Sequence, residues 1–418
     1  MRSDPLEPYD VVSRSAHLRR ATRKASWLAA FLLALGPGVI GLSADNDAGG
    51  MLSYLVTGSS HGLIVLVPTL LGLGLPTLFI GWLALRVADT THLPYSKALV
   101  AGLGVPFARL EALVLYGING LIMVTEFVGM TLSLSLVGLP TPLGLALTFA
   151  AVLLLTTSRV YARIERQLLT VALGSLLFIP ALLFVFVHPS TAALGHAFSA
   201  RVPDAAFLVL AMAGNAIPPW MIYWQQNAVW AGPARTSRQR LLDLVTGQVA
   251  MIVMAGTVLL LGAVMPGRES AFASPVAWIF HDGGHVAGVL FAVGLFDAGL
   301  LAACTVSLSS LWTVREAMGR GARHPAEAPN RGRWRYVHVA TLAAAAAVVL
   351  LPTLSVGSIA LWAQAVGALW MPASLTLLGL VASNRRVMGD RAIGRPAQAA
   401  VAAMTLGYLV LAWIGIGI

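Results

Sequence analysis

The sequence predicts an all-α protein that crosses a membrane about eleven times. Of its 418 residues, 58% are hydrophobic and only 11% are charged, whereas a typical soluble domain carries about 25% charged residues. The mean hydropathy is +0.81. Each spanning segment is expected to be helical, because lipid offers the backbone of an open chain no hydrogen-bond partner. The composition therefore excludes the soluble globular class.

Eleven apolar stretches match or approach the roughly 20 residues that a spanning helix needs. They cover residues 26–61, 63–86, 108–136, 142–158, 165–187, 204–231, 243–265, 286–313, 336–352, 357–382 and 397–417. No small-residue cleavage site follows the first stretch before Asp45, so we expect that helix to be retained. The predicted parts are a basic cytoplasmic segment (1–25), a transmembrane core (26–395) and a peripheral eleventh helix (396–418).

The basic residues support this map and give it an orientation. With the N-terminus inside, every Lys and Arg except Arg201 and Arg268 falls in a cytoplasmic segment. Such a bias is the positive-inside signature of a membrane protein. The net charge of +10 thus indicates topology and not nucleic-acid binding. We expect an integral protein of a bacterial-type cytoplasmic (inner) membrane, with the N-terminus inside and the C-terminus outside.

The first and sixth stretches are each interrupted at their centres. The first contains the sequence DNDAGG (45–50), and the sixth contains GNAIPPWM (214–221). They lie five spans apart and cross the membrane in opposite directions. Interrupted helices in corresponding positions of two halves point to the binding site of a transporter. Residues 26–190 and 204–383 would form inverted repeats of five helices each.

Asp47 is the leading candidate for a cation ligand. A carboxylate at the bilayer centre costs at least about 2.5 kcal/mol, and no Lys or Arg lies in the interior of a predicted span to compensate it, since Arg109 and Arg166 stand at span ends. A bound cation would supply the missing charge. The alternative, that Asp47 only caps the half-helix after the break, stays open, and one side chain could do both.

Other polar residues near the breaks are secondary candidates. Asp45 is a ligand, a cap or part of the access path, and Asn215 and Gln364 are either ligands or supporting hydrogen-bond partners. Four further residues could support the site or carry protons: Asn119 and Glu126 on one face of the third span, Gln225 after the second break, and Asp297 in the eighth span. Asp89, Glu111 and Asp243 lie at span ends and are expected to be solvated.

Signatures of other function classes are missing from the sequence. The chain contains no phosphate loop, no nucleophile elbow and no zinc-protease His pair, so we expect a non-enzyme without a resident cofactor. Its single cysteine, Cys304, lies in an apolar run and cannot form a disulfide within the chain.

Several motifs together resemble the Nramp family of divalent metal transporters. They are Gly-Pro-Gly (36–38) followed after eight residues by Asp47, MVTEFVG (123–129), GNAIPPWMIYWQQNAV (214–229), LWAQAV (361–366) and SNRRVMGD (383–390). Their order and spacing cover residues 30–395. The resemblance implies the LeuT-type fold with a 5+5 inverted repeat and a metal site at the two breaks.

The motifs also depart from the usual family pattern. The Asp-Pro-Gly-Asn motif reads Asp47-Ala48-Gly49-Gly50, and the methionine and histidine of the sixth helix are replaced by Pro218 and Trp220. Asn119 stands where the family has an acid in its third helix. Asp-Asn-Asp at the break resembles the Nramp-related magnesium transporter branch, which implies hard-cation transport without proton coupling, although that branch usually has Ser at position 218.

The main hypothesis is therefore a divalent metal transporter for magnesium or manganese, working by alternating access with weak or no proton coupling. Asp47 would be the central ligand, assisted by Asp45, Gln364 and the carbonyls around Ala44, Asn215 and Ala216. The alternatives are a proton-coupled manganese or iron importer of ordinary Nramp type, and an amino-acid or amine transporter on the same fold. Expected partners are the metal substrate and the bilayer; the oligomeric state stays open, and a monomer is compatible with the sequence.

Overall fold

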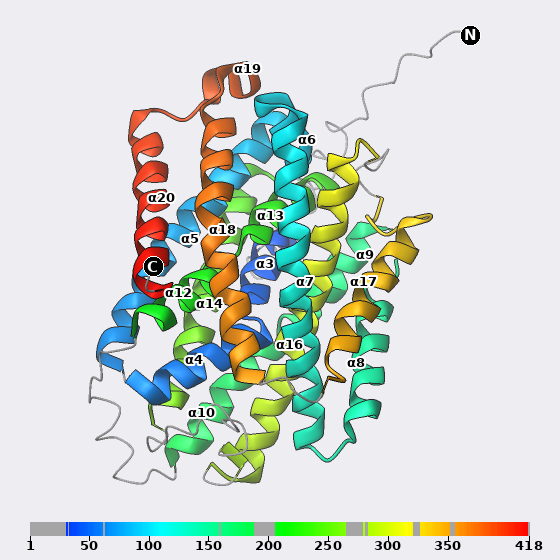
Figure 1. Cartoon of the computed structure of the whole chain (residues 1–418), viewed down its shortest axis with the longest axis vertical. Helices are drawn as coiled ribbons and strands as arrows, with labels where there is room; N and C mark the ends of the chain where they lie inside the picture. The colour runs from blue at the N-terminus through cyan, green and yellow to red at the C-terminus, as the bar shows by residue number, and fades with distance from the viewer. Residues whose placement is uncertain are drawn as a thin grey trace.

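The computed structural model describes residues 31, 33–61, 63–158, 160–187, 205–264, 279–280, 283–320, 327–351 and 356–416. This part of the chain is helical, and its β pairing is limited to one isolated bridge between Val160 and Glu327. Together the helices form one bundle (Figure 1). The predicted all-α class is confirmed.

Successive spans of the bundle run in alternating directions along the chain. The bounds of the helices are α3 (Pro37–Asp45), α4 (Ala48–His61), α5 (Leu63–Thr91), α6 (Tyr95–Leu103), α7 (Val105–Leu136), α8 (Thr141–Thr156), α9 (Tyr161–Val171), η1 (Gly174–Leu177), α10 (Phe178–Val187), α12 (Ala205–Ala216), α13 (Pro219–Ala231), α14 (Ser237–Ala263), α16 (Gly284–Ala317), α17 (Trp334–Val348), α18 (Val356–Ser383), α19 (Arg385–Met388), η2 (Gly389–Arg391) and α20 (Arg395–Ile416). Long helices such as α7, α18 and α20 stand close to upright in Figure 1, and α4 and α5 are tilted.

Eight helices of the described part are long and apolar enough to cross a membrane. They correspond to α5, α7, the α9–α10 segment, the α12–α13 pair, α14, α16, α18 and α20. The α3–α4 pair, α8 and α17 provide further crossings, although α8 has only 16 residues and α17 only 15. Together these elements account for the eleven predicted spans.

Both predicted interruptions are present. The α3 helix ends at Asp45, residues Asn46 and Asp47 are non-helical, and α4 begins at Ala48. In the sixth span, Ile217 and Pro218 separate α12 from α13, and Pro219 occupies the first position of α13. Proline suits that position because its missing N–H would be unbonded there anyway.

The two broken helices occupy the interior of the bundle. The α4 helix packs closely on α14: a Cβ built on Gly58 would lie 2.1 Å from the carbonyl oxygen of Leu259, and one on Gly262 would lie 2.1 Å from that of Leu55. Only glycine permits this backbone approach. By contrast, α20 contacts α12 and α18 at the edge of the bundle and leaves most of its surface exposed.

Three sequence expectations need correction at this level. The loop after the second span is partly helical, since α5 continues to Thr91 and α6 follows it. The fifth span starts at Tyr161 and is interrupted by the 3-10 turn η1. Glu111 and Asp243 are only 1% exposed and not solvated; Glu111 accepts hydrogen bonds from Trp370 Nε1 (2.8 Å) and Ser374 Oγ (2.5 Å) of α18.

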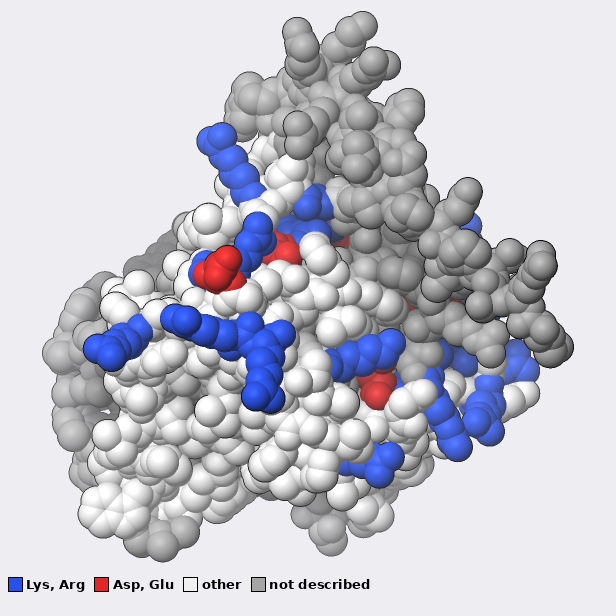
Figure 2. All heavy atoms as spheres, turned by 90° about the horizontal axis from the view of Figure 1, so that it is seen from above, with Lys and Arg blue, Asp and Glu red and all other residues white. Residues whose placement is uncertain are grey.

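Lys and Arg side chains gather at the end of the bundle that carries α6 and α19. Figure 2 views this end, hereafter the basic end, and shows many blue side chains across it with few red ones between them. The pattern agrees with the asymmetry of the sequence, because the segments that follow the second, fourth, sixth, eighth and tenth spans all lie at this end.

Candidate metal centre

Asp47 lies at the junction between α3 and α4 and is 3% exposed. Its Oδ1 accepts a hydrogen bond from the backbone N–H of Gly50 (2.5 Å), as expected of a residue that precedes a helix. The side-chain amide of Gln364, in α18, donates to Oδ1 (3.0 Å) and to Oδ2 (2.9 Å). Two elements far apart in sequence thus hold this carboxylate with neutral donors.

Glu126 of α7 joins the same junction. Its Oε2 accepts a hydrogen bond from the backbone N–H of Ala48 (2.9 Å), and its Oε1 accepts one from the Thr125 hydroxyl (3.0 Å). The side chain is fully buried. Glu126 therefore satisfies one free amide at the start of α4, while Asp47 satisfies another.

Asn215, near the end of α12, packs against α4. A Cβ built on Gly50 would lie 1.9 Å from Asn215 Oδ1, so the absence of a side chain at position 50 makes the space that the Asn215 amide occupies. Neither polar atom of Asn215 makes a hydrogen bond with the described residues, and the same is true of both carboxylate oxygens of Asp45. Both residues are 1% exposed. Buried polar groups without partners are costly, so these oxygens are available to a cation.

The predicted backbone ligands lie at the ends of the two half-helices α3 and α12. Ala44 is fully buried in the last turn of α3. The carbonyl oxygen of Ala216 accepts a hydrogen bond from the Thr77 hydroxyl of α5 (3.2 Å), so it already has one partner. A Cβ on Gly214 would lie 1.9 Å from the carbonyl oxygen of Gln364, and this close contact fixes α12 against α18 beside the junction.

The polar groups around the junction that could bind a metal are neutral, apart from the carboxylates. The described residues contain no cluster of three or more His, Cys, Asp or Glu suited to a metal. Among the ion pairs of this part of the chain, none includes Asp45, Asp47 or Glu126. A metal ion here would be bound by one or two carboxylates together with amide and carbonyl oxygens and water.

Three of the predicted supporting residues make contacts with other parts of the bundle and not with Asp47. Asn119 donates to Ser310 Oγ of α16 (2.7 Å), which joins α7 to α16. Asp297 packs against η1, where a Cβ on Gly174 would lie 2.3 Å from its carboxylate. Gln225 is buried within α13, beyond the second break, and its Nε2 has no hydrogen-bond partner among the described residues.

A network at the start of α3 was not expected from the sequence. Asp243 of α14 accepts hydrogen bonds from the backbone N–H groups of Gly36 (2.7 Å), Gly38 (2.7 Å) and Val39 (3.0 Å). Arg235 pairs with Glu165 (2.5 Å) and donates to the carbonyl of Leu35 (2.9 Å). The adjacent glycines of the Gly-Pro-Gly motif were the available signal, since their amides need an acceptor.

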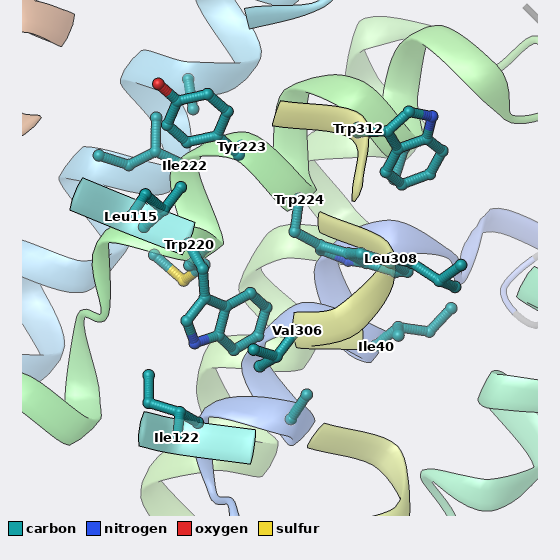
Figure 3. Close-up of a cluster of buried hydrophobic side chains, with 14 of the residues drawn as sticks. Ile40, Leu115, Ile122, Trp220, Ile222, Tyr223, Trp224, Val306, Leu308 and Trp312 are labelled. Atoms are coloured by element: carbon teal, nitrogen blue, oxygen red, sulfur yellow. The ribbon is translucent and has the colours of Figure 1, made fainter. Parts of the chain in front are cut away.

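Large aromatic side chains fill the space between this network and the junction. Figure 3 shows Trp224 of α13 between Trp312 of α16 and Ile40 of α3, with Trp220 of α13 near Val306. The Trp224 and Trp312 rings have centroids 5.9 Å apart, and Trp224 Nε1 donates to the carbonyl of Pro37 (3.0 Å). These side chains are at most 1% exposed, so they are closely packed in the interior of the bundle.

Comparison with known proteins places the chain in a family. The family described as natural resistance-associated macrophage protein-like, or Nramp, matches residues 38–417. The chain belongs to the Nramp family. A search of curated proteins found no significant match.

Solved structures agree with this assignment. A mutant of the Eremococcus coleocola manganese transporter has 15% identity and a TM-score of 0.72 over 94% of this chain and 88% of that chain. Mhp1, a nucleobase-cation-symport-1 family transporter in a closed conformation with bromovinylhydantoin bound, has 13% identity and a TM-score of 0.57 over 91% and 89%. The predicted LeuT-type Nramp fold, with broken first and sixth helices, is confirmed.

Proposed function

We propose that this Nramp protein transports divalent metal ions, with magnesium and manganese as its substrates, by alternating access. The observation that supports this most is the buried Asp47 carboxylate at the junction of two half-helices. It has neutral hydrogen-bond donors and no cationic partner in the described part of the chain. The buried carboxylate of Asp45 strengthens the proposal, because two acids at this depth need a positive charge to compensate them.

The proposed ligand set combines both breaks. Asp47 is the central ligand, and Asp45 and the Asn215 amide oxygen add hard donors from α3 and α12. Carbonyl oxygens of Ala44 and Ala216 complete the backbone contribution. Gln364 presents its NH₂ group to Asp47, so on metal binding its amide would turn to present Oε1 to the ion.

The Gly50–Asn215 contact supports a further distinction from the usual family site. The family motif has Asn at position 50, whereas here Asn215 supplies an amide from the opposite half of the protein. In this proposal the Asn215 amide takes the place of the amide that the family motif has at position 50. Magnesium takes oxygen ligands in an octahedral shell at about 2.0–2.1 Å and keeps several waters, which suits this oxygen-only set.

An amino-acid substrate fits the junction poorly. On this fold, a substrate carboxylate would be bound by free amides at a half-helix N-terminus. Here two of those amides of α4 already have acceptors, since Gly50 donates to Asp47 and Ala48 donates to Glu126. The carboxylate of an amino-acid substrate would lie beside these two buried acids and be repelled by them.

Ligand-dependent thermal stability separates the two functions. A ligand that binds only the folded protein stabilises it by RT ln(1 + [L]/Kd), about 2.7 kcal/mol at a hundred times Kd. We expect the melting temperature of the purified protein to rise with MgCl₂ and MnCl₂ and to stay unchanged with a panel of amino acids. Stabilisation by an amino acid and by neither metal would refute the proposal.

Proton coupling is expected to be weak or absent. A proton relay needs titratable groups in series, and here Asn119 and Trp220 stand at the two positions where the family has an acid and a histidine. Glu126 already accepts two hydrogen bonds. Metal uptake should therefore leave the pH inside proteoliposomes constant, as read by an enclosed dye. Metal-driven acidification that disappears in Glu126→Gln would contradict this.

Pro218→Met is expected to raise the affinity for cadmium relative to magnesium, because a thioether favours softer metals. The backbone at position 218 (φ −72°, ψ 143°) is extended, as any residue before a proline prefers, so methionine can adopt this backbone conformation. Calorimetric titration with Cd²⁺ and Mg²⁺ measures the ratio of affinities. The control is Pro218→Leu, which has similar bulk and no sulfur, and an equal ratio in both variants would contradict the expectation.

The orientation proposed from the sequence applies to the bundle as a whole. The basic end would face the cytoplasm of a bacterial-type inner membrane by the positive-inside rule, with the C-terminus outside. In this orientation the Asp243 network and the aromatic side chains close the cytoplasmic route to Asp47. Opening that route would connect the metal site with the cytoplasm, and the bundle of spans 1, 2, 6 and 7 would rock against the rest of the protein.

A further inference from the structure

A second cavity lies at the basic end, away from the metal centre. It has a volume of about 600 Å³ and lies between the end of α8 and the start of α17. These two helices run side by side at the edge of the bundle (Figure 1) and are joined by a hydrogen-bond contact between Thr156 Oγ1 and His338 Nε2 (2.9 Å). The metal-transport proposal uses none of these residues.

The polar wall of the cavity is basic. Arg331 and Arg335 line it, together with the hydroxyl-bearing side chains of Thr157, Ser158 and Tyr336. The described residues that line it include no Asp or Glu. Arg331 forms an ion pair with Glu327 at 3.9 Å, but its side chain is 58% exposed, so part of its guanidinium stays accessible to another anion. Two guanidinium groups with hydroxyls beside them match a phosphate group.

The apolar part of the cavity lining comes from the same two segments and continues onto the outside of the bundle. Leu153 and Val339 line the cavity, and Val339 is 38% exposed. Leu154 (76% exposed) lies next to Leu153, and Tyr336 is 63% exposed. Exposed side chains of this kind on two peripheral spanning helices lie in the hydrocarbon and interfacial layers. A ligand that fits both parts of the lining has an anionic head and an apolar tail.

We propose that this cavity binds the phosphate headgroup of an anionic phospholipid, with Arg331 and Arg335 as its phosphate ligands. The acyl chains would lie along the exposed faces of α8 and α17. Basic pockets between spanning helices on the cytoplasmic side are suited to such headgroups. The Arg335 guanidinium stacks on the Tyr336 ring at 4.7 Å and donates to its hydroxyl (2.6 Å), which holds this arginine at the interface.

Native mass spectrometry of the full chain tests the proposal. The protein is released from detergent micelles that contain phosphatidylglycerol or, separately, phosphatidylcholine. We expect selective retention of phosphatidylglycerol by the wild type and a loss of affinity of about 25-fold in R331A/R335A, since each interfacial arginine contributes about a factor of five. The matched control is R385A/R386A, which removes two exposed arginines of α19 at the same end.

The outcomes decide between a built site and a general attraction. Selective loss in R331A/R335A, with partial recovery in R331K/R335K, supports the proposal. Equal loss in R385A/R386A means that the whole basic end attracts lipid without a site, and equal retention of phosphatidylcholine excludes headgroup recognition. Displacement of the lipid by millimolar inorganic phosphate alone would show a soluble-anion site. If R331A/R335A does not fold, as judged by gel filtration, R331Q is measured instead under the same criteria.

Discussion

Asp47→Asn is expected to abolish metal transport while leaving the protein folded. The substitution removes the charge that the metal needs and keeps the shape of the side chain. The fold should tolerate it, because the Asn oxygen can still accept from Gly50 N–H and the Gln364 amide can turn to accept from the new NH₂ group. Removing a residue that only hydrogen-bonds to a metal ligand typically lowers metal affinity by about 10–100-fold. Loss of the central carboxylate itself should therefore reduce uptake by more than about a hundredfold.

Uptake of manganese into proteoliposomes measures this directly, with insertion checked by gel filtration and by protein content of the vesicles. The control is Asp390→Asn, which removes an exposed acid in the turn η2 and should leave uptake unchanged. Near-normal uptake by a well-inserted Asp47→Asn protein would show that the metal does not bind at this junction.

Asp243→Asn is expected to open the route from the basic end to Asp47. The carboxylate accepts three backbone N–H groups at the start of α3, and hydrogen bonds to a charged group contribute about 1.5–3 kcal/mol each. Asparagine has one acceptor oxygen, and its NH₂ group would face the remaining amides. Loss of a single bond would shift the equilibrium between closed and open forms by about tenfold or more.

Chemical labelling at Ile40 reports this opening. Ile40 is fully buried beside the aromatic side chains of Figure 3, and Cys304 is the only native cysteine, so Ile40→Cys on a Cys304→Ala background gives one reactive position. We expect its modification by a water-soluble maleimide to be about tenfold faster when Asp243→Asn is added. Asp390→Asn provides the background rate at the same end, and an unchanged rate in Asp243→Asn would show that this network is not a gate.

The positions of the helices and breaks could be predicted because they depend on local properties of the sequence. A spanning helix needs a long apolar run, and the dipeptide Pro218-Pro219 and the polar segment 45–47 cannot continue one. The predicted helix boundaries were wrong where the apolar run and the helix do not coincide. Polar residues extend α5 to Thr91 beyond the apolar run, and η1 interrupts a stretch that is apolar throughout.

The hydrogen-bond partners of the buried acids could not be predicted from the sequence, because they come from distant parts of the chain. Glu111 and Asp243 lie at the ends of apolar runs, where solvation is the usual outcome, but Trp370, Ser374 and the amides after Leu35 cover them. Similarly, the Gly50–Asn215 contact joins residues of the two halves. The sequence indicated that Asp47 needs a partner, but only the packing of α18 shows that Gln364 provides hydrogen bonds to it.

The central claim is that divalent metal crosses the membrane through the junction at Asp47. Its most direct test is uptake by proteoliposomes of the wild-type protein across a panel of Mg²⁺, Mn²⁺, Ca²⁺ and Cd²⁺, with internal pH recorded in the same vesicles. The account predicts uptake of Mg²⁺ and Mn²⁺ at constant internal pH, with mutual competition between the two ions. Uptake of Cd²⁺ that excess Mg²⁺ does not inhibit, or uptake of no metal in the panel, would contradict it.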